Sequence, residues 1–158
     1  MKRQPGRRAA TALLAAALAL TATACAKEEE PKKYPGAFPQ GHTDVSAEQA
    51  FRDHGVVKPA SAQDLGYNAW SADDSYPLTA VFTIGCTGAP GFAAANGLRG
   101  VPELSPDTVA VEVFAKDHGW TDTGSGDTRY LREKSANGSR LEVLVHASGE
   151  ECRVYLKS

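Results

Sequence analysis

The sequence lacks the motifs that mark most enzyme active sites. It contains neither GxSxG nor SxxK for a nucleophile, no HExxH for zinc, and no glycine loop ending in GK[ST] for a phosphate. Three cysteines are present, and no two have the CxxC spacing of redox or zinc sites. We therefore predict no catalytic residue, no metal and no cofactor, and the sequence alone does not identify a ligand.

An apolar run long enough to span a membrane is also missing. The stretch Ala9 to Leu20 would form a helix of about 18 Å, too short for a hydrocarbon core of about 30 Å. Small residues follow this stretch, and four basic residues precede it: Lys2, Arg3, Arg7 and Arg8. This order is typical of an export signal peptide, so we assign residues 1–24 to a leader that is removed.

Cys25 ends the run TATAC directly after this leader. The ending resembles the lipobox of bacterial lipoproteins, in which the cysteine thiol receives a diacylglycerol group and the leader is cut before the cysteine. The resemblance implies a palmitate-type anchor at Cys25 on the extracytoplasmic face of the cell membrane, since two or three acyl chains anchor a protein firmly. Twin-arginine export through Arg7-Arg8 stays open beside the general route, and a soluble secreted protein is the alternative.

The mature chain is short and acidic. Cleavage before Cys25 leaves 134 of the 158 residues, which fits one domain. The leader contains 4 of the 17 basic residues and none of the 19 acidic ones, so 13 basic residues face 19 acidic ones and the net charge is −6. This charge argues against nucleic-acid binding, which requires a basic surface. The Ala- and Gly-rich composition is typical of an actinobacterium.

Residues 25–43 combine clustered charges with proline and glycine. Such a composition buries little apolar surface and favours a flexible linker, which would separate the anchor from a single domain at 44–158. An alternative is that Tyr34 and Phe38 within this segment pack against the domain or a partner.

Cys86 and Cys152 are the cysteines of the mature chain besides the anchor. Outside the cytoplasm, an even pair in a small domain is expected to form a disulfide. Both residues have the parity of core-facing positions in the strands predicted around them, which supports this pairing.

The domain contains two segments with one pattern, a helix that ends at a His-Gly pair and then a hairpin. The first segment spans 46–86 and the second spans 105–157. Laying Tyr67 on Tyr130 aligns the two hairpins without a gap. The sequence predicts an α+β fold in which helices pack on one face of a four- or five-stranded antiparallel sheet, built from two tandem repeats; independent use of the same signals is the alternative.

Local signals support these elements. Ser46 is expected to cap the first helix, and Gly55 and Gly119 fit the left-handed position that ends a helix. Asn137-Gly138 is a strong hairpin turn. The expected core stripe of the second helix contains Ala110, Val113 and Phe114.

Aromatic residues around the first hairpin are the best indication of a binding surface: Tyr67, Trp70 and Tyr76. Tyr67 and Trp70 point to opposite sides of an extended chain, so one of them is expected to face solvent, where a ring can anchor a partner. The alternative is that helices cover both.

His54 and His118 each precede a stop glycine. A histidine there is favourable against the helix dipole, so we expect both to be helix-end residues without a catalytic or metal role. His146 on a strand face and His42 in the linker are weaker candidates for chemistry.

Together these patterns predict a lipid-anchored extracytoplasmic lipoprotein with a non-enzymatic binding role toward a protein or cell-envelope ligand. One alternative is a small envelope hydrolase. Another is a secreted module of the protein-inhibitor type, because the tandem architecture is similar to that of β-lactamase-inhibitor proteins, although no motif residues correspond.

Overall fold

The computed structural model describes residues 34–71, 76–103, 109–121, 126–134 and 140–158, with the backbone alone at Val109 and Ala110. The leader, Cys25 and the predicted turn at Asn137-Gly138 lie outside the described residues. The elements in chain order are α1 (Ala47–Asp53), β1 (Gln63–Asn68), β2 (Thr79–Gly85), the 3₁₀ turn η1 (Cys86–Gly88), α2 (Ala89–Ala95), β3 (Arg99–Val101), α3 (Val109–Asp117), β4 (Asp127–Arg132), β5 (Leu141–Ser148) and β6 (Glu151–Lys157). None of the described helices is both long and apolar enough to cross a membrane.

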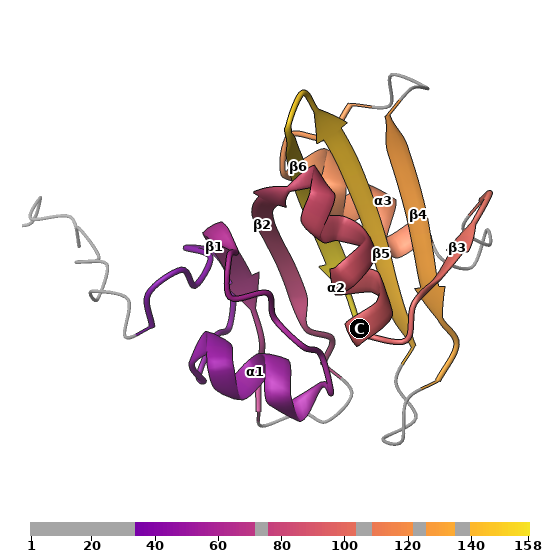
Figure 1. Ribbon diagram of the computed structural model, residues 1–158. Coiled ribbons are helices and arrows are strands. Elements are labelled where there is room, and N and C mark those ends of the chain that lie inside the picture. The colour runs from indigo at the N-terminus through magenta and orange to yellow at the C-terminus, as the bar shows by residue number, and fades with distance from the viewer. Residues whose placement is uncertain (1–33, 72–75, 104–108, 122–125, 135–139) are drawn as a thin grey trace, which may run out of the picture. The chain divides into compact units, whose positions relative to one another are not determined.

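One antiparallel sheet organises the domain (Figure 1). The strand order is β1-β2-β6-β5-β4-β3, and every neighbouring pair is antiparallel. The predicted α+β class with an antiparallel sheet is confirmed. The described sheet has six strands rather than four or five, because the edge strand β3 spans three residues and is too short to show an alternating pattern in sequence.

Helices cover both faces of this sheet, which differs from the predicted packing on one face. α1 and α2 lie in front of the sheet in Figure 1 and α3 lies behind it. Phe51 of α1 and Phe92 of α2 belong to one core cluster, whereas Val111 and Ala115 of α3 belong to a second. The reason is that the central strands are apolar on both faces: Phe82 of β2 is fully buried on the first face, while its neighbour Val81 is buried on the second.

The buried stripe of α3 lies elsewhere than predicted. Val111 and Ala115 are fully buried, Phe114 is partly buried, and Val113 is 47 % exposed. Val111 and Ala115 are four positions apart, so both face the sheet from the same side of the helix, and Val113 lies outside this stripe. The side chain of Ala110 lies outside the described residues.

The predicted helix ends are confirmed for α1. The backbone N–H of Gln49 donates to Ser46 Oγ at 3.3 Å, and Gly55 has a φ of +59°. Gly119, after α3, has a φ of +91°. These conformations favour glycine because a Cβ atom there is strained.

Arg132 of β4 joins the ends of the two front helices. Its Nη1 donates to the carbonyl oxygens of Gly55 at 3.1 Å and Asn96 at 3.2 Å, which follow α1 and α2. The buried Asn96 side chain also accepts from Val57 N at 2.7 Å and donates to Val57 O at 3.0 Å. The Arg132 cation at two helix C-termini and the Asn96 amide, which bonds both backbone groups of Val57, hold the ends of both helices next to β4.

The described part of the predicted linker, residues 34–43, packs on the domain, as the alternative for Tyr34 and Phe38 supposes. Phe38 N donates to Tyr67 O at 2.9 Å, and Tyr67 N donates to Gly36 O at 3.0 Å. A Cβ atom at Gly66 would lie 2.4 Å from the Phe38 ring, so glycine is needed there for the ring to fit. This segment therefore runs beside β1 as part of the domain.

The two hairpins have the same register. Tyr67 pairs with Ala80 in the first, and Tyr130 pairs with Val143 in the second, as the gap-free alignment requires. The helices that precede these hairpins, however, lie on opposite faces of the sheet. The duplication itself stays a prediction.

Cys86 of η1 and Cys152 of β6 form a disulfide, with their Cα atoms 4.8 Å apart and 66 positions apart in sequence. This confirms the pairing expected from their shared parity. The bond ties the start of the α2 segment to the central strand of the sheet.

Replacing both cysteines by alanine (Cys86→Ala with Cys152→Ala) should lower the free energy of unfolding by about 4 kcal/mol, because the disulfide closes a long loop in the unfolded chain. Denaturant unfolding of the two forms measures this difference. Labelling of the unfolded but unreduced chain should find no free thiol at either position. Labelled Cys86 or Cys152 would contradict the pairing.

Candidate functional site

Three rings form a partly exposed aromatic surface after β1, which we define as His42, Trp70 and Tyr76. The ring centroids of His42 and Trp70 are 5.9 Å apart, and those of Trp70 and Tyr76 are 5.8 Å apart at an interplanar angle of 86°. Trp70 is 38 % exposed, which is unusual among the large apolar side chains of the described residues. Two of the three residues predicted as an interaction surface, Trp70 and Tyr76, therefore lie together.

Polar contacts hold the backbone beneath these rings. Asn68 Nδ2 donates to the Tyr76 hydroxyl at 2.8 Å, and Thr43 Oγ1 donates to Asn68 Oδ1 at 2.9 Å. The Asp44 carboxylate accepts from both N and Oγ of Ser71 at 2.8 Å. The segment before α1 and the end of β1 are thus joined next to the aromatic surface, which limits how far the rings can move.

Tyr67 does not belong to this surface, which corrects its predicted role as an interaction residue. Its side chain is fully buried under α1, and its hydroxyl donates to Val45 O at 2.8 Å. Burial raises the pKa of Tyr67 to about 12. Tyr67 points toward the core because it shares the parity of the other inward residues of β1, whereas Trp70 follows the end of the strand.

His54 and His118 lie at helix ends, as predicted. His54 caps the end of α1, and its Nδ1 lies 2.6 Å from Ser158 Oγ. His118 follows α3, and its Nδ1 lies 2.8 Å from the carbonyl oxygen of Phe114. The His118 ring also packs on Phe38, with centroids 4.5 Å apart. Because α1 and α3 lie on opposite faces of the sheet, the structure does not bring these two imidazoles together.

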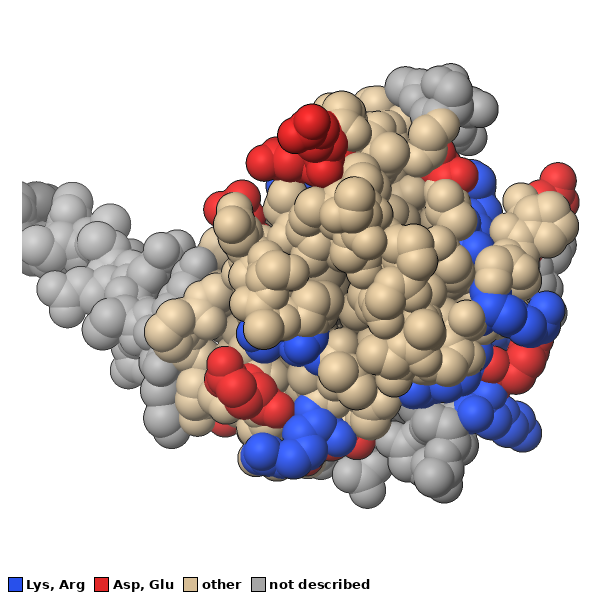
Figure 2. Space-filling model, in the orientation of Figure 1, with Lys and Arg blue, Asp and Glu red and all other residues tan. Residues whose placement is uncertain are grey.

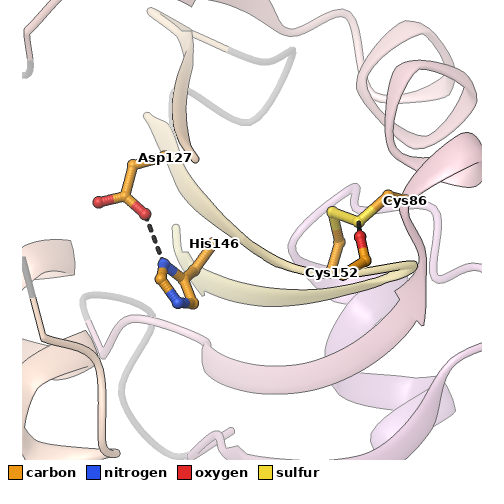
Figure 3. The surroundings of a disulfide bond; sticks show 5 residues. Cys86, Asp127, His146 and Cys152 are labelled. Carbon is orange, nitrogen blue, oxygen red and sulfur yellow. Dashed lines mark hydrogen bonds and ion pairs between the residues drawn. A yellow bond between two sulfur atoms is a disulfide. The ribbon is translucent and has the colours of Figure 1, made fainter. Parts of the chain in front are cut away.

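A carboxylate–imidazole pair that the sequence reasoning missed lies on β4 and β5 (Figure 3). His146 Nδ1 is 2.6 Å from Asp127 Oδ1, and Trp120 Nε1 donates to Asp127 Oδ2 at 3.2 Å. The Asp127 side chain is 5 % exposed and the His146 side chain 25 % exposed. A buried carboxylate that orients a solvent-reached imidazole is able to fix its tautomer.

The register of β4 and β5 in the structure brings this pair together. Once Tyr130 is paired with Val143, counting outward places Asp127 directly opposite His146. The pair is hidden in a plain sequence reading because the two residues lie 19 positions apart, and each looks like an ordinary loop or strand residue by itself.

Charged side chains on the α1 and α2 face lie mainly toward its rim (Figure 2). Acidic groups stand out at the upper and lower left of this view and basic groups along its right and lower rim, and uncharged residues fill most of its centre. Within the described parts of the chain, no group of three or more His, Cys, Asp or Glu side chains is placed to hold a metal ion.

Comparison with protein-family models, curated proteins and solved structures found no match to this chain.

His54 should make the stability of the domain depend on pH. Burial lowers the pKa of His54, and Asp53 opposes this shift. Below the ordinary imidazole value of about 6.5, the unfolded chain therefore binds more protons than the folded chain. The stabilising contribution is fully present above that pH and is lost as the pH falls through the folded pKa.

His54→Gln should accordingly flatten the acid side of the stability profile, measured by denaturant unfolding from pH about 7 to about 5. Val57→Thr, at an exposed position without a titratable group, is the control and should keep the wild-type slope. Equal slopes in His54→Gln and wild type would contradict the assignment.

Proposed function

We propose that this chain is an extracytoplasmic lipoprotein, anchored through Cys25, whose domain has a non-enzymatic binding role. The observation that carries the proposal is the Cys86–Cys152 disulfide. Structural disulfides persist in oxidising compartments and are rare in the cytoplasm. The disulfide agrees with the export leader at 1–24, and the leader ends at a cysteine suited to acylation.

A short tether follows from the same proposal. Cys25 and the first described residue, Tyr34, are nine positions apart, a distance that an extended chain spans in about 30 Å at most. Since residues 34–43 pack beside β1, they add no reach. The domain would stay close to the bilayer, so its partner is another component of the envelope surface.

The aromatic surface of His42, Trp70 and Tyr76 is the proposed contact with that partner. Exposed tryptophan and tyrosine side chains contribute most of the binding energy in many interfaces. The hydrogen bonds of Asn68 and Asp44 order the backbone below the rings before binding, which reduces the entropy that association would cost. A protein or another envelope ligand with an apolar patch fits this surface.

The hydrolase alternative rests on one specific observation, the Asp127–His146 pair. A carboxylate that orients an imidazole is the arrangement of a general base. A nucleophile must also lie within hydrogen-bond reach of the free ring nitrogen. Among the described residues, the two thiols are joined in the disulfide and no hydroxyl is bonded to His146. The binding role therefore has the better support.

Acylation at Cys25 tests the anchor. The mature protein should begin at Cys25 and have the added mass of a diacylglycerol group, which intact-mass spectrometry of the native protein measures. Cys25→Ser should release the domain to the medium or leave the leader uncut, because one acylation site carries the whole attachment. A mature N-terminus elsewhere, or an unmodified Cys25 thiol, would refute the anchor.

Trp70→Ala tests the contact surface. Partners captured by crosslinking on intact cells should be identified with the wild type and then titrated as purified components. Trp70→Ala should weaken that affinity by about tenfold or more, as expected for a tryptophan at an interface centre. Val113→Ala, an exposed apolar residue on α3 across the sheet, should leave the affinity unchanged. Equal loss in both variants would exclude the aromatic surface as the contact.

A further inference from the structure

Four polar side chains form a row across the central strands, on the sheet face that α3 covers in part. Strand pairing places Thr83 opposite Arg153, Arg153 opposite His146, and His146 opposite Asp127. Directly paired antiparallel residues have their Cβ atoms about 5 Å apart. All four residues keep part of their surface exposed. Solvent therefore reaches part of this row beside the core.

Asp127 fixes the direction of the His146 ring. An ionised carboxylate only accepts hydrogen bonds, so His146 Nδ1 donates the proton at 2.6 Å. Because Nδ1 points toward β4, the connectivity of the ring places Nε2 at its outer end, on the side of β6. Trp120 Nε1 occupies the other carboxylate oxygen at 3.2 Å, which holds Asp127 in place. The orientation of the Nε2 atom is therefore fixed before a ligand binds.

Arg153 lies on the β6 side of this ring. Its Nε is buried and has no hydrogen-bond partner among the described residues, while the Arg153 side chain also forms a hydrogen bond with the Tyr155 hydroxyl. Among the ion pairs of the described residues, none includes Arg153. A buried guanidinium nitrogen without an acceptor is costly, and an anion is the acceptor that a guanidinium prefers.

We infer that one anionic group, a carboxylate or a phosphate, binds between His146 Nε2 and Arg153, and that its binding is coupled to protonation of His146. With His146 protonated, the row has two positive charges and the single negative charge of Asp127, so a monoanion neutralises it. With His146 neutral, Nε2 presents a lone pair that repels the anion. The site takes up a proton together with its ligand.

The groups around the row are compatible with this site. Burial raises the pKa of Tyr155 on β6, so its hydroxyl stays neutral. Lys116 of α3 lies 5.7 Å from the centre of the Trp120 ring and adds positive potential. Glu112 of α3 is paired with Arg129 at 2.8 Å, and Glu151 is exposed two positions before Arg153. Besides Asp127, Glu151 is the acidic group near the anion, and water screens it.

The test uses the purified full chain in detergent, with inorganic phosphate and acetate as probes. Nuclear magnetic resonance of the histidine ring nitrogens follows His146 during each titration. A saturable change at His146 is expected at pH about 5.5, with an affinity about tenfold lower at pH about 8, because a protonated imidazole binds an anion more tightly than a neutral one. The probe that binds more tightly identifies the anionic group.

Matched variants separate this site from weak surface binding. Arg153→Gln should weaken anion binding by about tenfold or more at the lower pH, and His146→Gln should remove the dependence on pH. Arg99→Gln, at an exposed arginine of β3 paired with Glu133, is the control and should leave both unchanged. Circular dichroism confirms that each variant is folded.

Equal affinity in Arg153→Gln and wild type would indicate an adventitious ion only and would overturn the site. Equal affinity at the two pH values would overturn the proton coupling, and the absence of any saturable change would overturn both. None of these results bears on Cys25 or on the aromatic surface, so a failure here leaves the proposed function testable by itself.

Discussion

The burial of both faces of the central strands is the constraint on which the rest of the domain depends. Val154 of β6 packs under α1 and α2, while its neighbour Tyr155 packs under α3. A sheet with two apolar faces is stable in water only when both are covered, since each buried side chain contributes about 1.5–3 kcal/mol. The three described helices are therefore divided between the faces rather than gathered on one.

Each helix layer makes polar contacts with β4. Arg132 bonds the carbonyl groups that end α1 and α2, and Asp127 receives the indole N–H of Trp120 just after α3. The two residues lie at opposite ends of the same strand. Burial of apolar side chains is non-directional, whereas hydrogen bonds require a defined geometry. Polar contacts of this kind therefore help to fix the position of each helix on the sheet.

Much of this fold could be predicted because local signals decide it. The Ser46 cap and the glycines at 55 and 119 follow from short-range patterns, and the Cys86–Cys152 pairing follows from the small number of cysteines and their parity. The face on which α3 packs could not be predicted from the sequence. A strand such as β5 is apolar on both faces, so a helix can pack equally well on either face. The Asp127–His146 pair and the buried position of Tyr67 depend likewise on tertiary contacts that no local pattern encodes.

The segment beside β1 has a consequence for neighbouring copies of the chain. A strand at a sheet edge offers unpaired N–H and C=O groups to any other extended chain, which is a common route to aggregation. Here the backbone of Gly36 and Phe38 occupies those groups of Tyr67, and the Phe38 ring covers Gly66. A protein crowded in two dimensions on a membrane meets its own copies often. If the proposed lipid anchor at Cys25 is correct, the stretch that follows it would also protect this edge from pairing with other copies of the chain.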